Sequence, residues 1–247
     1  MNLLIETHCH SHYSHDCKTS MQSIGERCRR LGINFIVIND HDTCGVLDRD
    51  EAILASYGVT VIKGIEFTTK EGAHIIGIHS DIKSLENERG YYSLIELVNR
   101  LSLLGAKIIV PHPEHYTGLL GCGAVDADVD YVLRKTHFVE KENFKYGPSS
   151  CTQRISENYP NVKFIVGSDA HSIEDVGSQI NSIVVEKIED PIEGLYNSTD
   201  VEFVFNKRHG NMYWAFRHFQ ASKIYQLVIR VMRPELRRRI KRIFMKK

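Results

Sequence analysis

Residues 3–10 read LLIETHCH, an apolar run that ends in two alternating histidines. The run predicts a strand over Leu3–Thr7, with His8 directly after it and His10 two residues further on. Because alternate residues of an extended chain point to the same face, both imidazoles can reach one ion. The segment therefore predicts a metal site at the end of a strand.

Similar runs rich in Val and Ile alternate with longer segments of helical period, which is typical of repeated β-α units. A chain of 247 residues suits one large α/β barrel domain. The interval from Thr60–Ile65 to His74–His79 is too short for a helix, so we expect an irregular or seven-stranded barrel. The expected strands are Leu3–Thr7, Phe35–Asn39, Thr60–Ile65, His74–His79, Lys107–Val110, Phe138–Lys141, Lys163–Gly167 and Ser182–Glu186. The expected helices are Met21–Leu31, Asp48–Tyr57, Tyr91–Leu104 and Pro148–Asn158, with Pro148 in a first turn.

Side chains that bind metals gather at or near the ends of these strands. In barrels of parallel strands those ends face one common mouth, so residues far apart in sequence converge there. Ordinary caps would mix in Ser, Thr and Asn, whereas these positions hold His, Asp and Glu. The chain has 13 histidines, and imidazole is the commonest protein metal ligand near neutral pH. The positions are His8, His10, Asp16, Asp40, His41, Asp42, Glu66, His74, His112, Asp169 and His171.

In this order the residues resemble the PHP (polymerase and histidinol phosphatase) family of metallohydrolases, over about residues 3–187. The resemblance implies a distorted seven-stranded (β/α) barrel of TIM-like form and a metal-dependent phosphoesterase. The motifs that carry it are His8-x-His10, Ser14-x-Asp16, Asp40-His41, Gly64-Ile65-Glu66, His74-Ile75-Ile76-Gly77, Pro111-His112-Pro113 and Gly167-Ser168-Asp169-Ala170-His171.

The resemblance also implies two or three divalent cations at the mouth of the barrel. Mixed His and carboxylate sites of this kind suit Mn, Fe or Zn. The first site would be held by His8, His10, Glu66 and Asp169, the second by Glu66 as a bridge with His74 and His112, and the third by Asp16, His41 and His171.

Several neighbouring residues leave alternatives open. His15 is a second potential ligand beside Asp16, and His79 competes with His74. His115 stands where an apolar residue is expected, so we expect it to meet substrate. His115 and His12 are the candidate catalytic acids, although a lone loop histidine is more often a solvated surface residue.

Such a cluster suits phosphate-ester hydrolysis. Paired cations lower the pKa of a shared water and neutralise charge on the attacked phosphoryl group, so we expect a metal-bridging hydroxide to attack phosphorus. The leading hypothesis is a phosphatase acting on small phosphomonoesters, such as a nucleotide, a sugar phosphate or histidinol phosphate. The alternatives are a phosphodiesterase or exonuclease, a protein-tyrosine phosphatase, and a non-catalytic metal-binding module.

Charge divides the chain into two predicted parts. Residues 207–247 hold 13 of the 31 Lys and Arg and one acid, giving +12, so the barrel of residues 1–206 carries −12. An acidic body disfavours a stable nucleic-acid partner. The tail is predicted to be a basic amphipathic helix that packs on the barrel. The alternative is attachment to an anionic membrane surface.

The cysteines and the N-terminus indicate the compartment. The 6 cysteines include no C-x-x-C pair, and neither a signal peptide nor a run of about 18 apolar residues is visible. We therefore expect a cytoplasmic protein with reduced thiols, which the membrane alternative for the tail would place at the inner face of the membrane.

Overall fold

Ten strands and six α-helices occur in residues 2–185 and 190–206, the part of the chain that the computed structural model describes. The strands are β1 (Asn2–Cys9), β2 (Phe35–Ile38), β3 (Thr60–Thr68), β4 (His74–Ile78), β5 (Lys107–Val110), β6 (Phe138–Asn143), β7 (Gly147–Pro148), β8 (Lys163–Gly167), β9 (Gln179–Val184) and β10 (Glu202–Phe205). The helices are α1 (Met21–Leu31), α2 (Asp48–Ser56), α3 (Leu94–Leu104), α4 (Asp126–Lys135), α5 (Thr152–Asn158) and α6 (Pro191–Asn197), and a 3₁₀ turn covers Ile82–Leu85.

Local signals set the ends of the two longest helices. Ser20 accepts a hydrogen bond from the backbone N–H of Ser23 at the start of α1, and Ser93 caps α3 in the same way. Gly32 and Gly105 end these helices at φ values of 71° and 76°, in the left-handed region that favours glycine. Between the caps, each helix buries one apolar face.

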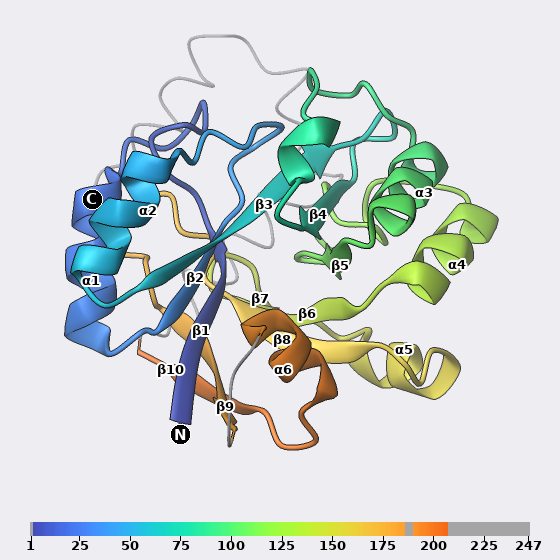
Figure 1. Ribbon diagram of the computed structural model, residues 1–247. Coiled ribbons are helices and arrows are strands. Elements are labelled where there is room, and N and C mark those ends of the chain that lie inside the picture. The colour runs from blue at the N-terminus through green and yellow to red at the C-terminus, as the bar shows by residue number, and fades with distance from the viewer. Residues whose placement is uncertain (1, 186–189, 207–247) are drawn as a thin grey trace, which may run out of the picture.

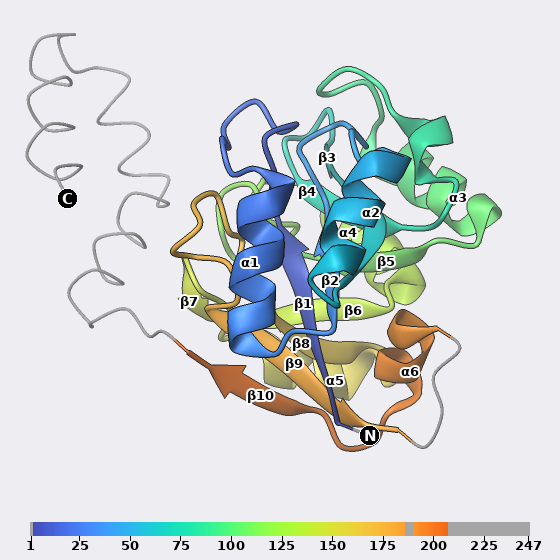
Figure 2. The same cartoon turned by 60° about the vertical axis from the view of Figure 1, so that its left-hand side comes forward.

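The strands form one curled mixed sheet in the order β10-β9-β1-β2-β3-β4-β5-β6-β7, with β8 paired to β6. Strands β1, β2 and β3 run parallel, as do β5, β6 and β8, whereas β4 is antiparallel to both β3 and β5. Helices α1 and α2 pack side by side on one flank, and α3 and α4 on another (Figure 1). The long loops after β1 and β2 lie at the end of the molecule opposite the N-terminus (Figure 2).

One asparagine ties β8 and β9 to β1. The Asn181 side chain donates to Val166 O (2.9 Å) and accepts from Val166 N (3.0 Å), and it also donates to Thr7 Oγ1 (3.2 Å). Beyond the strand ends, the backbone N–H of His10 donates to Ala170 O at 3.0 Å. These bonds draw the two ends of the sheet together and so bring the residues after β8 beside those after β1.

The described elements agree with the expected α/β class and with most expected ranges, and they differ in several details. Helix α5 starts at Thr152, so Pro148 is not in its first turn; it lies in β7 and pairs with Glu142 of β6. Helices α4 and α6 and strands β7 and β10 were not expected. The sheet has ten strands in the described residues, so the count of seven stays a prediction about which of them form the barrel. The basic tail lies outside the described residues.

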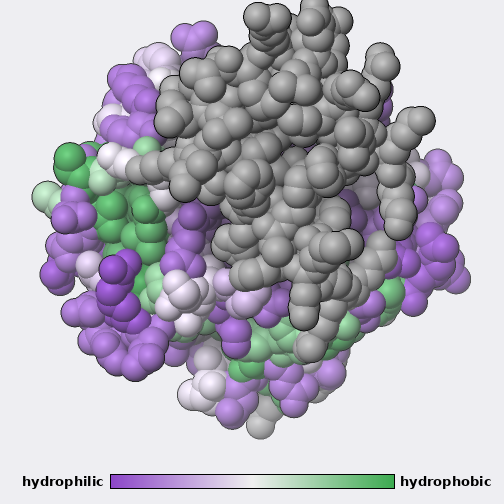
Figure 3. Space-filling model, turned by 180° about the vertical axis from the view of Figure 1, so that it is seen from behind, coloured by the Kyte–Doolittle hydropathy of each residue, from purple (hydrophilic) through white to green (hydrophobic). Residues whose placement is uncertain are grey.

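Where Figure 3 shows the surface in colour, most residues are hydrophilic, and hydrophobic residues gather in two places, one at the left and one towards the bottom of the view. Within the described ranges, no helix combines the length and the apolar character that crossing a membrane requires.

Candidate metal centre

The site residues gather where the parallel strands end. His41, His112 and Asp169 follow β2, β5 and β8, as the sequence predicts, whereas His8 and Glu66 lie inside β1 and β3, which are longer than expected. His74 begins β4 rather than ending a strand. Because β4 is antiparallel to β3, with Thr68 opposite His74, the start of β4 lies at the same end of the sheet.

Glu66 is the centre of the cluster. Its carboxylate is surrounded by one ring nitrogen from each of five histidines: His8 (3.4 Å), His10 (3.2 Å), His41 (3.3 Å), His74 (2.9 Å) and His112 (3.1 Å). Burial alone would raise the pKa of Glu66, but its interactions with the surrounding histidines, that with His74 first, outweigh burial and hold the pKa well below its usual range. The carboxylate therefore stays ionised and can bridge two cations.

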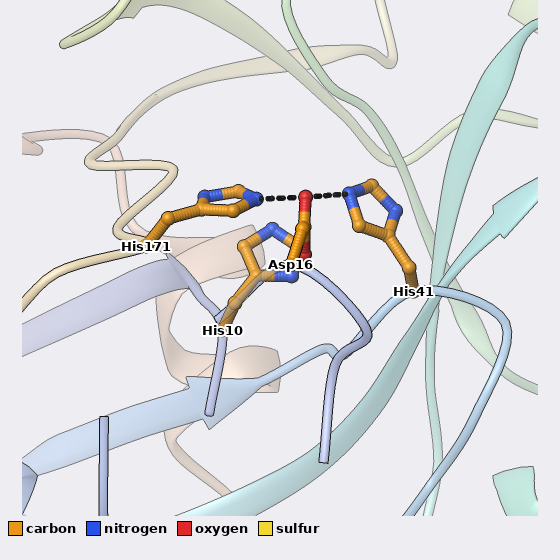
Figure 4. A group of neighbouring side chains, drawn as sticks. All are labelled: His10, Asp16, His41 and His171. Atoms are coloured by element: carbon orange, nitrogen blue, oxygen red, sulfur yellow. Dashed lines mark hydrogen bonds and ion pairs between the residues drawn. The ribbon is translucent and has the colours of Figure 1, made fainter. Parts of the chain in front are cut away.

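Asp16, His41 and His171 form a second group at the rim (Figure 4). Asp16 Oδ2 lies 2.9 Å from His171 Nε2 and 3.5 Å from His41 Nε2. Burial would raise the pKa of Asp16, yet its hydrogen bond with His171 and the nearby His41 lower it. Burial lowers the pKa of His41 to about 3, which leaves this imidazole neutral and able to bind a cation.

Asp169 joins the two groups. Its Oδ1 lies 3.4 Å from His10 Nε2, 3.3 Å from His171 Nδ1 and 3.0 Å from Lys145 Nζ. Burial would raise its pKa, but the charges of Lys145 and His8 hold the pKa well below the usual value. Asp169 and His112 adopt φ values of 49° and 29°, a region that non-glycine residues rarely occupy and that occurs at functional sites.

The donor set fits divalent cations. Three groups of residues each bring one His or carboxylate atom per residue within 4.8 Å of the others in the group: His8, His10 and Glu66; His41, Glu66 and His74; and His10, Asp16, His41 and His171. Within the described residues, the buried His74 Nε2 has no hydrogen-bond partner. Imidazole rings grouped around one carboxylate can offer nitrogen lone pairs to a cation, which displaces any proton they carry. His41 contacts both Glu66 and Asp16, so it lies between the second and third expected sites rather than in one of them alone.

Three buried carboxylates support the cluster. The sequence placed Asp40 among the metal-binding positions but gave no role to Glu6 or Glu140. Glu140 contacts the ring of His8, and Asp40 accepts hydrogen bonds from the backbone N–H (2.6 Å) and the hydroxyl (2.7 Å) of Ser11. Glu6 accepts from the backbone of His8 (3.1 Å) and from Ser168, and burial raises its pKa to about 7. An acidic residue inside an apolar strand was the available signal for Glu6 and Glu140.

The sequence left the roles of His12, His15 and His79 open, and the structure shows where each of them lies relative to the cluster. His79 follows the other end of β4, where its Nδ1 accepts from Asp81 N (3.0 Å), and it lines a different cavity. The exposed His15 has its ring 5.3 Å from that of His41. His12 is also exposed and lies against Tyr13, outside the lining of the cavity over the cluster.

His115 lines this cavity, with its ring stacked on Tyr146 at 3.9 Å and its Nδ1 2.8 Å from Thr117 Oγ1. Burial, with help from His112, lowers the pKa of His115 to about 2, so the imidazole is neutral near pH 7. A neutral ring suits a hydrogen-bonding role better than that of a cationic acid.

A cavity of about 500 Å³ opens over the cluster. Besides the candidate ligands, its walls include two cations, Lys145 and Arg89, and two tyrosines, Tyr116 and Tyr146. Lys145 was not singled out from the sequence, because it lies in the turn between β6 and β7 rather than at the end of an expected strand. The cavity thus combines a buried anionic and imidazole floor with basic and aromatic walls.

The model of the PHP domain family matches residues 6–199. The chain belongs to the PHP domain family. The three clusters able to bind metal all lie within the matched residues. The family model covers most of the barrel and includes every candidate ligand from His8 to His171.

Individual relatives of this PHP domain differ in their activities. A 5'-3' exoribonuclease of Haemophilus influenzae is 33% identical over 79 residues, which are 31% of this chain and 28% of that protein. A two-domain protein from Bacteroides vulgatus, described as containing a predicted PHP-like metal-dependent phosphoesterase, superposes with a TM-score of 0.66 at 18% identity, over 90% of this chain and 70% of that one. A lesion-specific endonuclease from Pyrococcus furiosus superposes with a TM-score of 0.60 at 17% identity, over 82% of this chain and 58% of that one. Such distant structures show the shared fold alone.

Proposed function

We propose that this PHP domain hydrolyses a phosphomonoester of a small molecule and holds two or three divalent cations, of Mn, Fe or Zn type. The observation that carries the proposal is the cavity of about 500 Å³ over the cluster, a volume typical of pockets for small molecules. The acidic charge of residues 1–206 favours a small substrate over a long polyanion.

The residues divide into binding and supporting roles. His8, His10, Asp16, His41, Glu66, His74, His112, Asp169 and His171 would hold the cations. When bound, these ions supply Lewis-acid stabilisation of the phosphoryl oxygens and a water of lowered pKa. Lys145 Nζ, 3.0 Å from Asp169 Oδ1, stands at the edge of the cluster, where an ammonium group can bind a phosphate oxygen. Arg89 would bind a second polar or anionic part of the substrate.

A second candidate is an exonuclease that releases one nucleotide from a strand end. The exoribonuclease name of the Haemophilus influenzae relative favours it, although the match spans a small part of that protein. The tyrosines also favour it, because Tyr116 and Tyr146 line the same cavity and aromatic rings can stack on a nucleobase. In this case the cavity would hold the terminal nucleotide, and the rest of the strand would leave through the mouth.

Hydrolysis of defined substrates separates the two. The protein, loaded in turn with Mn(II), Zn(II) and Fe(II), is assayed on nucleoside monophosphates, sugar phosphates, histidinol phosphate, a phosphotyrosine peptide, a phosphodiester and a 5'-labelled oligoribonucleotide. The proposal expects phosphate release from a monoester at the highest kcat/KM. A higher kcat/KM on the oligonucleotide, with mononucleotide products, would establish the exonuclease instead.

Two variants test whether the cluster carries the activity. Asp169→Ala removes a central carboxylate and is expected to lower kcat/KM more than about 100-fold. Asp200→Ala removes an exposed carboxylate before β10 and serves as the matched control. Equal activity of the two variants would refute the site.

A further inference from the structure

Glu140, in β6, is fully buried directly behind the cluster. Its Oε1 lies 2.7 Å from His8 Nδ1. Its Oε2 accepts two hydrogen bonds of 2.8 Å, from the backbone N–H of His112 and from the side-chain amide of Asn143. Three donors from three segments of the chain therefore converge on one carboxylate.

The contact with His8 has a consequence for its ring. A carboxylate only accepts hydrogen bonds, so His8 Nδ1 must carry a proton. The other ring nitrogen, Nε2, faces the cluster, 3.4 Å from Glu66 Oε2 and 3.7 Å from Asp169 Oδ1. A His8 ring held in this way through Nδ1 directs Nε2 to the place where a cation would bind, and Nε2 would offer its lone pair to that cation.

We propose that Glu140 is a positioning residue for the metal centre, which fixes the tautomer and the ring orientation of His8 and the backbone of His112. Carboxylates behind metal-binding histidines act in this manner and raise the basicity of the imidazole. Of the histidines around Glu66 in the described residues, His8 is the one whose far nitrogen meets a carboxylate outside the cluster. The far nitrogens of His10 and His112 have no hydrogen-bond partner there.

The packing of β8 gives independent support. A Cβ added at Gly167 would overlap Glu140 Oε1 and would lie 2.9 Å from the Cβ of His8. Only glycine at this position leaves room for the pair. Gly167→Ala is therefore a way to displace the carboxylate without removing it.

The decisive experiment measures metal binding without substrate, so its outcome does not depend on which phosphoester is hydrolysed. Zn(II) affinity is measured by competition with a chelator for the wild type, Glu140→Gln and Gly167→Ala. In Glu140→Gln the amide presents one acceptor and one donor to three donors, so His8 or His112 loses its partner. We expect both variants to bind Zn(II) about 10- to 100-fold more weakly.

Glu142→Gln is the matched control, because Glu142 lies two residues along the same strand and bonds with Gln179 (3.0 Å) rather than with a candidate ligand. Its Zn(II) affinity should equal that of the wild type. A structural role alone would lower the midpoint of thermal unfolding and leave the affinity of the folded protein unchanged, which would overturn the proposal.

A second measurement observes the ring itself. In Zn(II)-loaded protein labelled with ¹⁵N-histidine, the Nδ1–H signal of His8 should be protected from exchange with water in the wild type and lost or shifted in Gly167→Ala. Should Glu140→Gln fail to fold, the affinity and this signal in Gly167→Ala still decide. An unchanged signal together with unchanged affinity would exclude the positioning role.

Discussion

At the scale of single residues, two buried carboxylates, Glu66 and Asp169, carry negative charge at the centre of the cluster. Glu66 and Asp169 are buried, and their low pKa values are maintained by histidines and by Lys145 rather than by solvent. Burying anions costs free energy unless cations compensate them. The same feature that makes this region costly without bound ions makes it a strong site for them.

Lys145 provides the first prediction. Lys145→Gln removes the ammonium group 3.0 Å from Asp169 while keeping a polar side chain. A hydrogen bond to a charged group is worth about 1.5–3 kcal/mol, so kcat/KM should fall about 10- to 100-fold, mainly through KM if Lys145 binds phosphate in the ground state. Steady-state kinetics on the best monoester substrate measure this.

The matched control is Lys141→Gln, because Lys141 lies in β6, four residues before Lys145, with its ammonium 4.2 Å from the centre of the Phe203 ring. Its kinetic constants should match those of the wild type. A wild-type KM for Lys145→Gln would contradict the phosphate-binding role.

At the scale of elements, the second prediction concerns the contact between β9, β8 and β1. Asn181→Leu removes both hydrogen bonds with Val166 and the one to Thr7. The buried backbone groups of Val166 would lose these partners, which should lower the free energy of unfolding by about 2–4 kcal/mol. Urea denaturation measures the change.

Two further results accompany this variant. Ser182→Ala, next in β9, removes one partly buried hydrogen bond to Asn2 and should cost about 1 kcal/mol or less. Amide hydrogen exchange at Val166 should become faster in Asn181→Leu. If both variants lowered the free energy equally, Asn181 would have no special part in joining the strands.

The elements also explain which parts of the site the sequence could predict. His41, His112 and Asp169 follow short, continuous apolar runs, which predict buried strands from their length and their Val and Ile content. In β1 the pairing with β2 shifts between Glu6 and Cys9, so Ile5 packs in the interior while His8, three residues on, faces Glu66. Such a bulge follows from the neighbouring strand and leaves no local pattern.

Other elements were missed for different reasons. Helix α4 buries only Val132 and Leu133, so its apolar stripe is too narrow to be recognised from period alone. Glu140 was visible only as an acidic residue in a strand. Its role depends on donors from His8, His112 and Asn143, and residues 132 and 28 positions away along the chain cannot be paired from one sequence.

At the scale of the whole molecule, the third prediction concerns acid. Burial, reinforced by Lys107, lowers the pKa of His137 from 6.5 to about 4. Above pH 6.5 both the folded and the unfolded chain hold His137 neutral. As the pH falls from 6.5 towards 4, the unfolded chain takes up the proton first, so the free energy of unfolding decreases over this window. Below about pH 4 both states hold the proton, and His137 causes no further change.

The size of this effect is about 1–2 kcal/mol after allowance for solvent screening, since the ring is partly exposed. His137→Gln keeps an acceptor for the backbone N–H of Ile108 and does not titrate. The difference in unfolding free energy between the two proteins should therefore change between pH 6.5 and 4. If the unfolding free energies of the wild type and His137→Gln changed with pH in the same way, another group would be responsible.

The fourth prediction concerns metal removal, which acts on the entire sheet. The candidate ligands come from β1, β3 and β4 and from the segments after β1, β2, β5 and β8, so a cation bound there links most of the barrel. Ions that bind only the folded chain stabilise it by about 2.7 kcal/mol at 100 times their dissociation constant. Chelation should therefore lower the midpoint of thermal unfolding, and restoring Mn(II) or Zn(II) should reverse the change.

Asp169→Asn separates this linkage from other effects of the chelator. The variant keeps the shape of the side chain but loses the charge that faces His10, His171 and Lys145. Its unfolding midpoint should respond much less to added metal than that of the wild type, because weaker binding gives less stabilisation at the same ion concentration. Calorimetric midpoints that rise equally in both proteins would mean that the stabilising ion binds elsewhere in the chain.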